Sequence, residues 1–225
     1  MFVCRVLSME WRKHKHEEQS IDVMNDPETI QALTNCGLYK FFTILGMKTQ
    51  LDLLEWMVGK WNVKEEEFII GDHMLIIDVD DMYFLYALPC HWVEISLYGH
   101  RGGGETNSPY LIQHCTPRVS PKDGRIDIKT LARLPLKAIG FIVARLCGSA
   151  TLHLLTKAHM QTTIESLQPN IFNWCEVVVT NLKGKLTRVK TNKLKNFGYG
   201  AFVISFSLEW IPLLAPRVAI ERGGP

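Results

Sequence analysis

The fold is decided by residues 171–212, IFNWCEVVVTNLKGKLTRVKTNKLKNFGYGAFVISFSLEWIP, in which an apolar, a basic and a second apolar segment follow one another. In the first segment apolar residues recur every three or four positions, as on the buried face of a helix. This spacing predicts a helix over residues 172–189. The second apolar segment, 199–210, has a strand-like composition, but its length favours a buried helix.

Two helices are predicted near the start of the chain. Asp26 can cap the free amides of a first turn and Pro27 suits the first helical position, so a helix should begin there and end near Gly37. Apolar residues at helical spacing predict the next helix from Thr49 onward. Additional apolar residues widen its stripe, so this helix is expected to be buried on more than one side.

A β-hairpin and a third helix are predicted next. Residues 68–77 form two short apolar runs around a Gly-Asp turn, which is typical of a small hairpin. Asp78 then caps a helix over 79–88. We expect Tyr83 to lie on its buried side and Phe84 to widen the same apolar surface.

The second half of the chain is predicted to be helical. Asp127 should cap a helix in which Pro135 allows a kink, and another helix is expected over about 157–167. Together these signals predict a mainly α, multi-helix globular domain with one small β-hairpin around residues 68–77. We expect a disordered leader (1–22), one folded region (23–216) and a disordered tail (217–225).

Charge divides the folded region into halves. The sequence carries 9 basic and 17 acidic residues up to Tyr110, and 16 basic and 6 acidic residues after it. We therefore distinguish an acidic half (23–90), a loop or linker (91–126) and a basic helical half (127–216). Such polarity indicates either contact with nucleic acid or another acidic partner, or attraction between the two halves.

Compartment signals favour an intracellular, non-secreted protein. The six cysteines lie far apart without a CxxC pair, and the N-terminal sequence lacks the order of a signal peptide. The most apolar windows, 134–147 and 199–215, are interrupted by charged residues or proline, so no membrane span is expected.

An acidic cluster, Asp78, Asp80 and Asp81, is a candidate for catalytic metal binding. Carboxylates can hold magnesium in a transposase-like enzyme. However, their position directly before a helix also fits an N-cap with acidic residues in the first turn. We favour the capping role and expect no metal, no cofactor and no catalytic residues.

A basic run begins within the helix predicted over 172–189 and continues beyond its end, and no acidic residue occurs between Glu176 and Glu209. Cations that neutralise phosphates beside stacking aromatics could bind nucleic acid without sequence specificity. The alternative is a solvated helix end or a face that packs on the acidic half. The candidate nucleic-acid-binding residues are Lys183, Lys185, Arg188, Lys190, Lys193 and Lys195.

Two blocks carry a resemblance to a known family. LIIDVDDMYFL followed by Leu88-Pro89, and the segments FNWC and KNFGYG through SFSLE, resemble signatures of the plant mobile domain, also labelled aminotransferase-like. The resemblance covers roughly residues 23–216. The motif residues are Asp78, Val79, Leu85, Leu88, Pro89, Trp174, Lys195, Phe197, Gly198, Tyr199, Gly200 and Glu209.

The resemblance implies a nuclear protein of transposable-element origin, related to proteins of genome maintenance and gene silencing in plants. The family has no established catalytic residues to carry over. The aminotransferase label has no support, because pyridoxal phosphate needs a buried Schiff-base lysine and an acid at its ring nitrogen, whereas the lysines here lie mainly in solvated, basic contexts. Departures from the family pattern, such as Tyr86-Ala87 and Trp210, are compatible with a degenerate transposon copy.

Three functions follow as hypotheses. The first is a non-enzymatic nuclear module that acts through contacts with other nuclear proteins. The second is a nucleic-acid-binding protein that uses the basic run over 183–195. The third is a metal-dependent, transposase-like enzyme that uses the acidic cluster.

Overall fold

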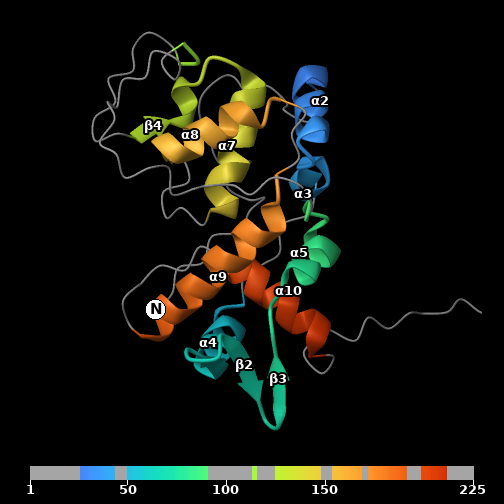
Figure 1. Cartoon of the computed structure of the whole chain (residues 1–225), viewed down its shortest axis with the longest axis vertical. Coiled ribbons are helices and arrows are strands. Elements are labelled where there is room, and N and C mark those ends of the chain that lie inside the picture. Colours follow the sequence, from blue (N-terminus) through green and yellow to red (C-terminus); the bar gives the residue numbers. More distant parts are fainter. Residues whose placement is uncertain are drawn as a thin grey trace, which may run out of the picture.

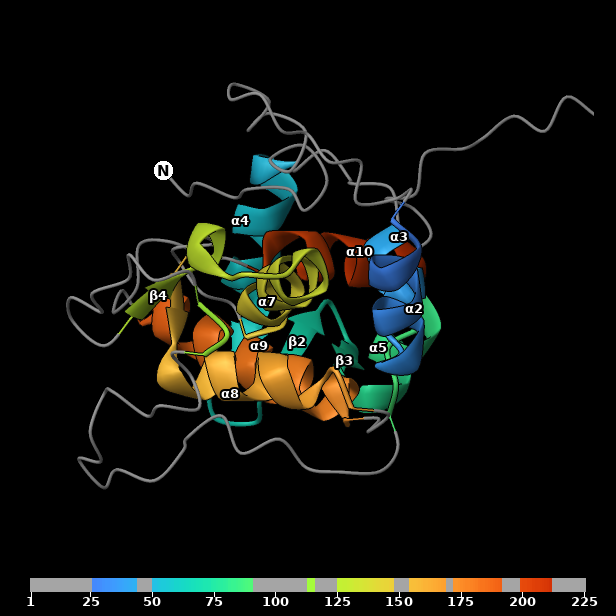
Figure 2. The same ribbon diagram turned by 90° about the horizontal axis from the view of Figure 1, so that it is seen from above.

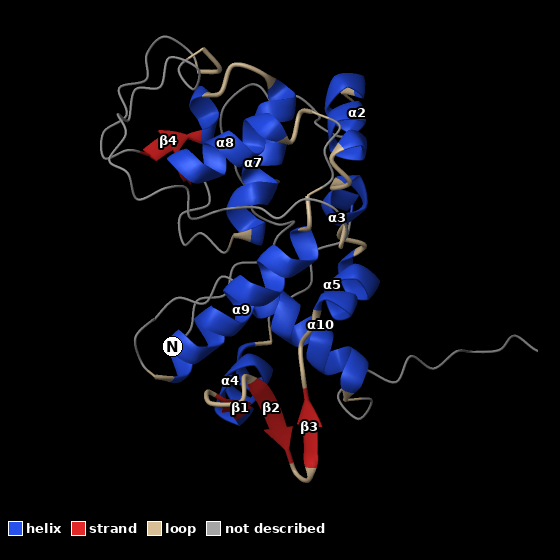
Figure 3. Ribbon diagram, viewed as in Figure 1, coloured by secondary structure: helices blue, strands red, loops and turns tan. Residues whose placement is uncertain are grey.

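The described part of the chain is mainly helical, which confirms the predicted fold class (Figure 3). The computed structural model describes residues 26–43, 50–90, 113–115, 125–147, 154–168, 172–191 and 199–211. The predicted leader and tail, and most of the predicted linker, lie outside these residues. The elements are α2 (Pro27–Asn35), α3 (Tyr39–Thr43), α4 (Leu51–Lys60), β1 (Trp61–Asn62), β2 (Glu67–Ile70), β3 (His73–Leu75), α5 (Val79–Tyr86), β4 (Arg125–Asp127), the 3-10 helix η2 (Ile128–Thr130), α7 (Leu134–Leu146), β5 (Leu154–Thr156), α8 (Lys157–Glu165), α9 (Trp174–Lys190) and α10 (Gly200–Trp210).

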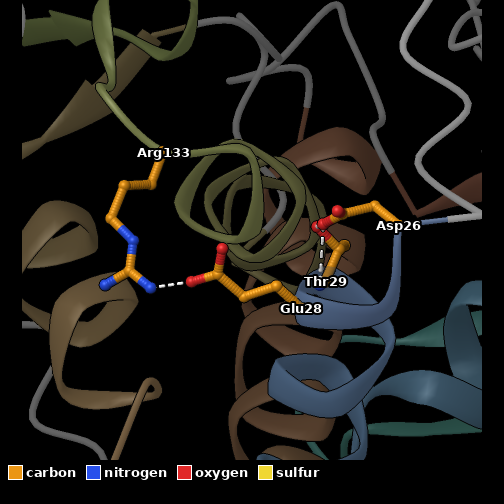
Figure 4. A network of polar contacts seen from close by, with 4 residues as sticks. All are labelled: Asp26, Glu28, Thr29 and Arg133. Carbon is orange, nitrogen blue, oxygen red and sulfur yellow. Dashed lines mark hydrogen bonds and ion pairs between the residues drawn. The ribbon is translucent and has the colours of Figure 1, made fainter.

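The predicted start of α2 is confirmed. The Asp26 carboxylate accepts hydrogen bonds from the Thr29 backbone N–H at 2.8 Å and from the Thr29 hydroxyl at 2.5 Å. Pro27 occupies the first turn. Glu28, also in that turn, forms an ion pair with Arg133, the residue just before α7 (Figure 4). The N-terminus of α2 is thereby tied to the second half of the chain.

Gly37 ends the turn after α2 and brings two distant segments together. Its φ of +73° lies in the left-handed region that favours glycine. A Cβ at this position would lie only 2.5 Å from Cγ of Pro89, so a side chain would clash. Because Gly37 has no side chain, Pro89, which follows α5, can pack directly against the end of α2.

The predicted hairpin is confirmed, and it belongs to a larger sheet. β2 and β3 are antiparallel, with Ile70 opposite His73 across the Gly71-Asp72 turn. The two-residue strand β1 pairs with β2 on its other side, giving the order β1-β2-β3. β1 was not predicted, because two residues are too few to show an alternating pattern.

α5 begins as predicted but ends earlier. Asp78 and Asp81 form a reciprocal capping box at its start. Ala87 then adopts a left-handed conformation with φ of 50°, so the helix ends at Tyr86 rather than Leu88.

The region around Pro135 corrects one prediction. Asp127 caps only the 3-10 helix η2, by accepting a hydrogen bond from the Lys129 N–H. Pro135 lies in the first turn of a separate helix, α7, where its missing N–H costs nothing, so it starts a helix instead of kinking one. β4 and β5 flank this region and pair in a small sheet that was not predicted.

The main core joins the acidic and basic halves. α9 and α10 confirm the two predicted C-terminal helices, and they supply many of the core side chains. Phe206 of α10 packs against Phe68 of β2 at 5.8 Å between ring centres. The indole N–H of Trp61 donates to the Thr187 hydroxyl of α9 at 3.1 Å. The residues 172–211 therefore complete a core that begins more than 100 positions earlier.

A smaller core lies around α7 and α8. It contains Leu136 and Ala144 of α7, Leu155 of β5 and Met160 of α8, all fully buried. Figure 1 places α7, α8 and β4 at one end of the molecule and β2 and β3 at the other, with α9 and α10 between them. In Figure 2, α2 and α5 lie on one side and β4 on the opposite side.

Candidate interaction surfaces

The described basic residues of α9 do not share one face. At about 100° per residue, Lys183 and Lys190 project within about 20° of each other. Lys185 and Arg188 project on roughly the opposite side, about 140–200° away. The buried stripe of α9 runs between these two pairs. The basic run therefore flanks the buried stripe on both sides.

Lys185 is partly withdrawn from solvent. Its Nζ lies 5.1 Å from the centre of the buried Tyr199 ring, whose hydroxyl donates to the Leu146 carbonyl at the end of α7 at 2.6 Å. Burial lowers the pKa of Lys185 from 10.5 to about 8, and the nearby Arg188 charge acts in the same direction. Lys185 is thus an exception to the expectation that the lysines are solvated.

The remaining basic residues are dispersed. Lys190 is exposed, and its ammonium donates to the Gly59 carbonyl of α4. Arg188 is exposed and Lys183 is half-buried. Lys193 and Lys195 lie outside the described residues. The four described cations thus have four different environments.

The acidic cluster has a structural role at the start of α5. One Asp78 oxygen accepts from the N–H groups of Asp80 and Asp81 at 3.0 and 3.1 Å, and Asp81 accepts from the Asp78 N–H at 2.9 Å. The other Asp81 oxygen accepts from the Trp210 indole N–H at 2.8 Å. Burial raises the pKa of Asp81, and the Asp78 carboxylate adds to that rise, while the hydrogen bonds from the Asp78 N–H and the Trp210 indole oppose it. Two of the three carboxylates are therefore engaged in capping.

The family-motif residues lie mostly inside the molecule. Leu88, Trp174, Tyr199 and Gly200 are buried, and Val79, Leu85 and Pro89 are partly buried. Among the described motif residues, Asp78 and Glu209 are exposed. Lys195, Phe197 and Gly198 lie outside the described residues. The described part of the motif thus mainly builds the core.

Large apolar side chains are exposed along β2, β3 and α5, and here two predictions are wrong. Tyr83 and Phe84 were expected to face the core, yet they are 56% and 73% exposed. Met82 and Tyr86 of the same helix do face inward: both are buried in the main core, and the Tyr86 hydroxyl donates to the Ala201 carbonyl of α10. We define the hairpin–helix surface as the five exposed residues Ile69, Met74, Ile76, Tyr83 and Phe84.

The hairpin–helix surface lies in an acidic part of the chain. Residues 65–90 contain seven carboxylates and no lysine or arginine. Asp72, Asp78 and Asp80 are exposed, and within the described residues none of the three forms an ion pair. The apolar side chains therefore lie among uncompensated negative charges.

The described residues contain neither a metal-binding cluster nor a membrane-spanning helix. No group of three or more His, Cys, Asp or Glu side chains there is placed to hold a metal ion. No helix in the same part of the chain has the length and hydropathy needed to cross a membrane.

The fold and its surfaces define a mainly α domain with an exposed apolar and acidic hairpin. Comparison of the chain with protein-family models, with curated proteins and with solved structures finds no match.

Proposed function

We propose that this chain is a non-enzymatic protein-interaction module that acts in the nucleus and derives from a transposable element. Its sequence resemblance to the plant mobile domain supports the nuclear setting, the mobile-element origin and a relation to genome maintenance and gene silencing. The hairpin–helix surface supports protein contact as the mode of action, and it is the observation that carries the proposal.

The hairpin–helix surface exposes apolar side chains that a partner protein could bury. Met74 and Phe84 are 68% and 73% exposed, and burial of one such side chain in an interface is worth about 1.5–3 kcal/mol. Clusters of exposed apolar side chains with a polar rim mark interaction sites. Exposed carboxylates of Asp72, Asp78 and Asp80 lie in the same segment of the chain and would select the partner by charge.

The proposal is tested by affinity purification from plant nuclei with the tagged full-length chain. Phe84→Lys places a charge in the hairpin–helix surface, whereas Trp56→Lys makes the same change at a 40% exposed aromatic residue of α4. We expect specific partners to be retained by Trp56→Lys and lost from Phe84→Lys. Recovery of no specific partner by the wild type, or equal recovery by both variants, would contradict the proposal.

Nucleic-acid binding is the second candidate, and the exposed Arg188 in a segment without acidic residues favours it. Binding through several phosphates would weaken steeply as salt increases. Combined Lys→Ala substitutions at Lys185, Lys190, Lys193 and Lys195 should then reduce affinity and flatten the salt dependence. Salt-insensitive binding, or binding unchanged by these substitutions, would exclude this candidate.

A further inference from the structure

Within the described part of the chain, β3 is an edge strand, and its outer backbone groups face no other strand there. Among the described residues it pairs only with β2. The two-residue turn makes Ile70 and His73 a hydrogen-bonded pair, and pairs alternate along an antiparallel ladder. Ile69 and Met74 are therefore a non-hydrogen-bonded pair. The N–H and C=O of Met74 consequently point away from β2, toward the open edge.

The side chains along this edge alternate in character. Phe68 and Leu75 face each other on the inner side of the hairpin, where Phe68 is fully buried. Met74 and Ile76 belong to the opposite, outer side and are 68% and 58% exposed. Ile69, the partner of Met74, is 42% exposed on that same outer side. The open edge thus carries an apolar outer face.

Acidic residues stand at both ends of this apolar row. Asp72, Met74, Ile76 and Asp78 occupy every second position, so the order is acid, apolar, apolar, acid. Asp72 belongs to the turn just before β3, and at about 3.3 Å per residue the four steps from Met74 to Asp78 span roughly 13 Å of extended chain. The Asp78 backbone is itself extended, and one carboxylate oxygen serves both of its capping hydrogen bonds. The second oxygen of Asp78 is thus available for a cation.

We propose that β3 binds an extended segment of a partner protein in which two alternate apolar residues are flanked by lysine or arginine. The segment adds to the sheet as an antiparallel fourth strand next to β3, and its backbone pairs with Met74. Its apolar side chains pack beside Met74 and Ile76, and its basic ends lie opposite Asp78 and Asp72. The inference rests on the proposed function and names the partner chemistry.

A second copy of this chain fits the edge less well. Pairing of β3 with itself would bring two segments together from a region with seven carboxylates and no lysine or arginine. Like charges across paired strands are destabilising. Charge complementarity therefore favours a basic partner segment over a β3–β3 dimer.

The test uses the full-length chain and the fluorescent probe acetyl-Lys-Thr-Val-Thr-Val-Thr-Lys-amide, with binding measured by fluorescence anisotropy. A probe with glutamate at both ends removes the charge match, and a probe with serine in place of valine removes the apolar match. We expect each to bind at least about tenfold more weakly than the parent probe, because charge and apolar complementarity both contribute.

Backbone pairing is tested without altering the protein. In the proposed register the two valines lie opposite Met74 and Ile76, with their N–H groups toward β3. N-methylation of both valines should abolish binding, whereas N-methylation of the threonines on either side of the second valine should preserve it. Equal effects of the two methylated probes would overturn strand addition.

Protein variants provide the complementary test. Met74→Pro removes an N–H that faces the open edge and no hydrogen bond to β2, so it should weaken probe binding by about tenfold without lowering the thermal midpoint markedly. If Met74→Pro unfolds the chain, Asp72→Asn, a conservative turn substitution, should still weaken binding and reduce its salt dependence. Unchanged binding by the folded variant would overturn the proposal, as would a dimer that Met74→Pro dissociates.

The two proposals can fail separately. Partners lost from Phe84→Lys, together with no binding of the probe, would refute strand addition and leave the interaction module standing. Probe binding without any specific nuclear partner would support the edge site and refute the proposed cellular role.

Discussion

Replacement of Lys185 by methionine should stabilise the fold, although it removes a cation from the basic run. The wild-type pKa of about 8 lies roughly 2.5 units below the ordinary lysine value, which corresponds to about 3 kcal/mol against the charged form. The contact between Nζ and the Tyr199 ring offsets about 0.5–2 kcal/mol of this penalty. Methionine fills a similar volume without a charge. We therefore expect the free energy of unfolding to rise by about 1–2 kcal/mol near pH 7.

The gain should depend on pH with a definite sign. Between its folded pKa of about 8 and its unfolded value of 10.5, Lys185 binds more protons in the unfolded chain. The wild type therefore gains stability as pH rises through this window. The advantage of Lys185→Met should be complete below about pH 8 and gone above about pH 10.5.

Titratable groups beside Lys185 can also change their pKa values when Lys185 is replaced by methionine. Burial raises the pKa of Cys147 to about 12 and lowers that of His159, and Arg188 also lies near Lys185. Removal of the Lys185 charge should also let the pKa of His159 rise toward its usual value, because that charge helps to lower it. This adds a smaller change in stability below the ordinary histidine pKa of 6.5, which is distinct from the alkaline window.

The assay is urea unfolding of both proteins at several pH values, followed by tryptophan fluorescence. Lys183→Met is the matched control, because it removes the same charge from a half-buried side chain only two positions away in the same helix. We expect it to change stability by less than about 0.5 kcal/mol. Destabilisation by Lys185→Met at pH 7, or a gain that persists unchanged at pH 10.5, would refute this reasoning about burial.

Three further substitutions test the fold. Asp78→Ala should cost about 1 kcal/mol in thermal unfolding by removing the cap of α5, whereas Asp80→Ala should cost less than about half as much. Tyr86→Phe should cost about 1–2 kcal/mol in chemical unfolding, because its buried hydroxyl contacts α10 at 2.5 Å; no loss would refute that contact. Phe68→Ala should cost about 3–5 kcal/mol and Phe84→Ala less than about 1 kcal/mol; equal losses would contradict their opposite burial.

Local chemistry explains what was predictable from the sequence. Asp26 and Asp78 each stand directly before a helix, and capping depends only on residues within one turn. The hairpin likewise follows from its Gly-Asp turn between two apolar runs. These predictions hold because their causes lie within a few residues.

The failures share a different cause. Tyr83 and Phe84 look like core residues by composition, but which side of α5 is buried depends on where α10 packs, more than 100 residues later. Lys185 looks solvated within a basic run, but the Tyr199 ring covers it from another helix. Hydrophobic periodicity cannot reveal partners that the chain supplies from a distance.

The long-range core also has a consequence for synthesis of the protein. Trp61 donates a hydrogen bond to Thr187, and Tyr86 donates one to Ser205. Residues 50–90 therefore cannot complete their packing until residues 172–211 have left the ribosome. At about 5–20 residues per second, the intervening hundred or so residues take roughly 5–20 s to appear. Throughout that interval Phe68, fully buried in the finished fold, lacks its α10 partner. The nascent first half therefore exposes apolar surface of the kind that chaperones bind, and we expect a chain truncated before α9 to be aggregation-prone.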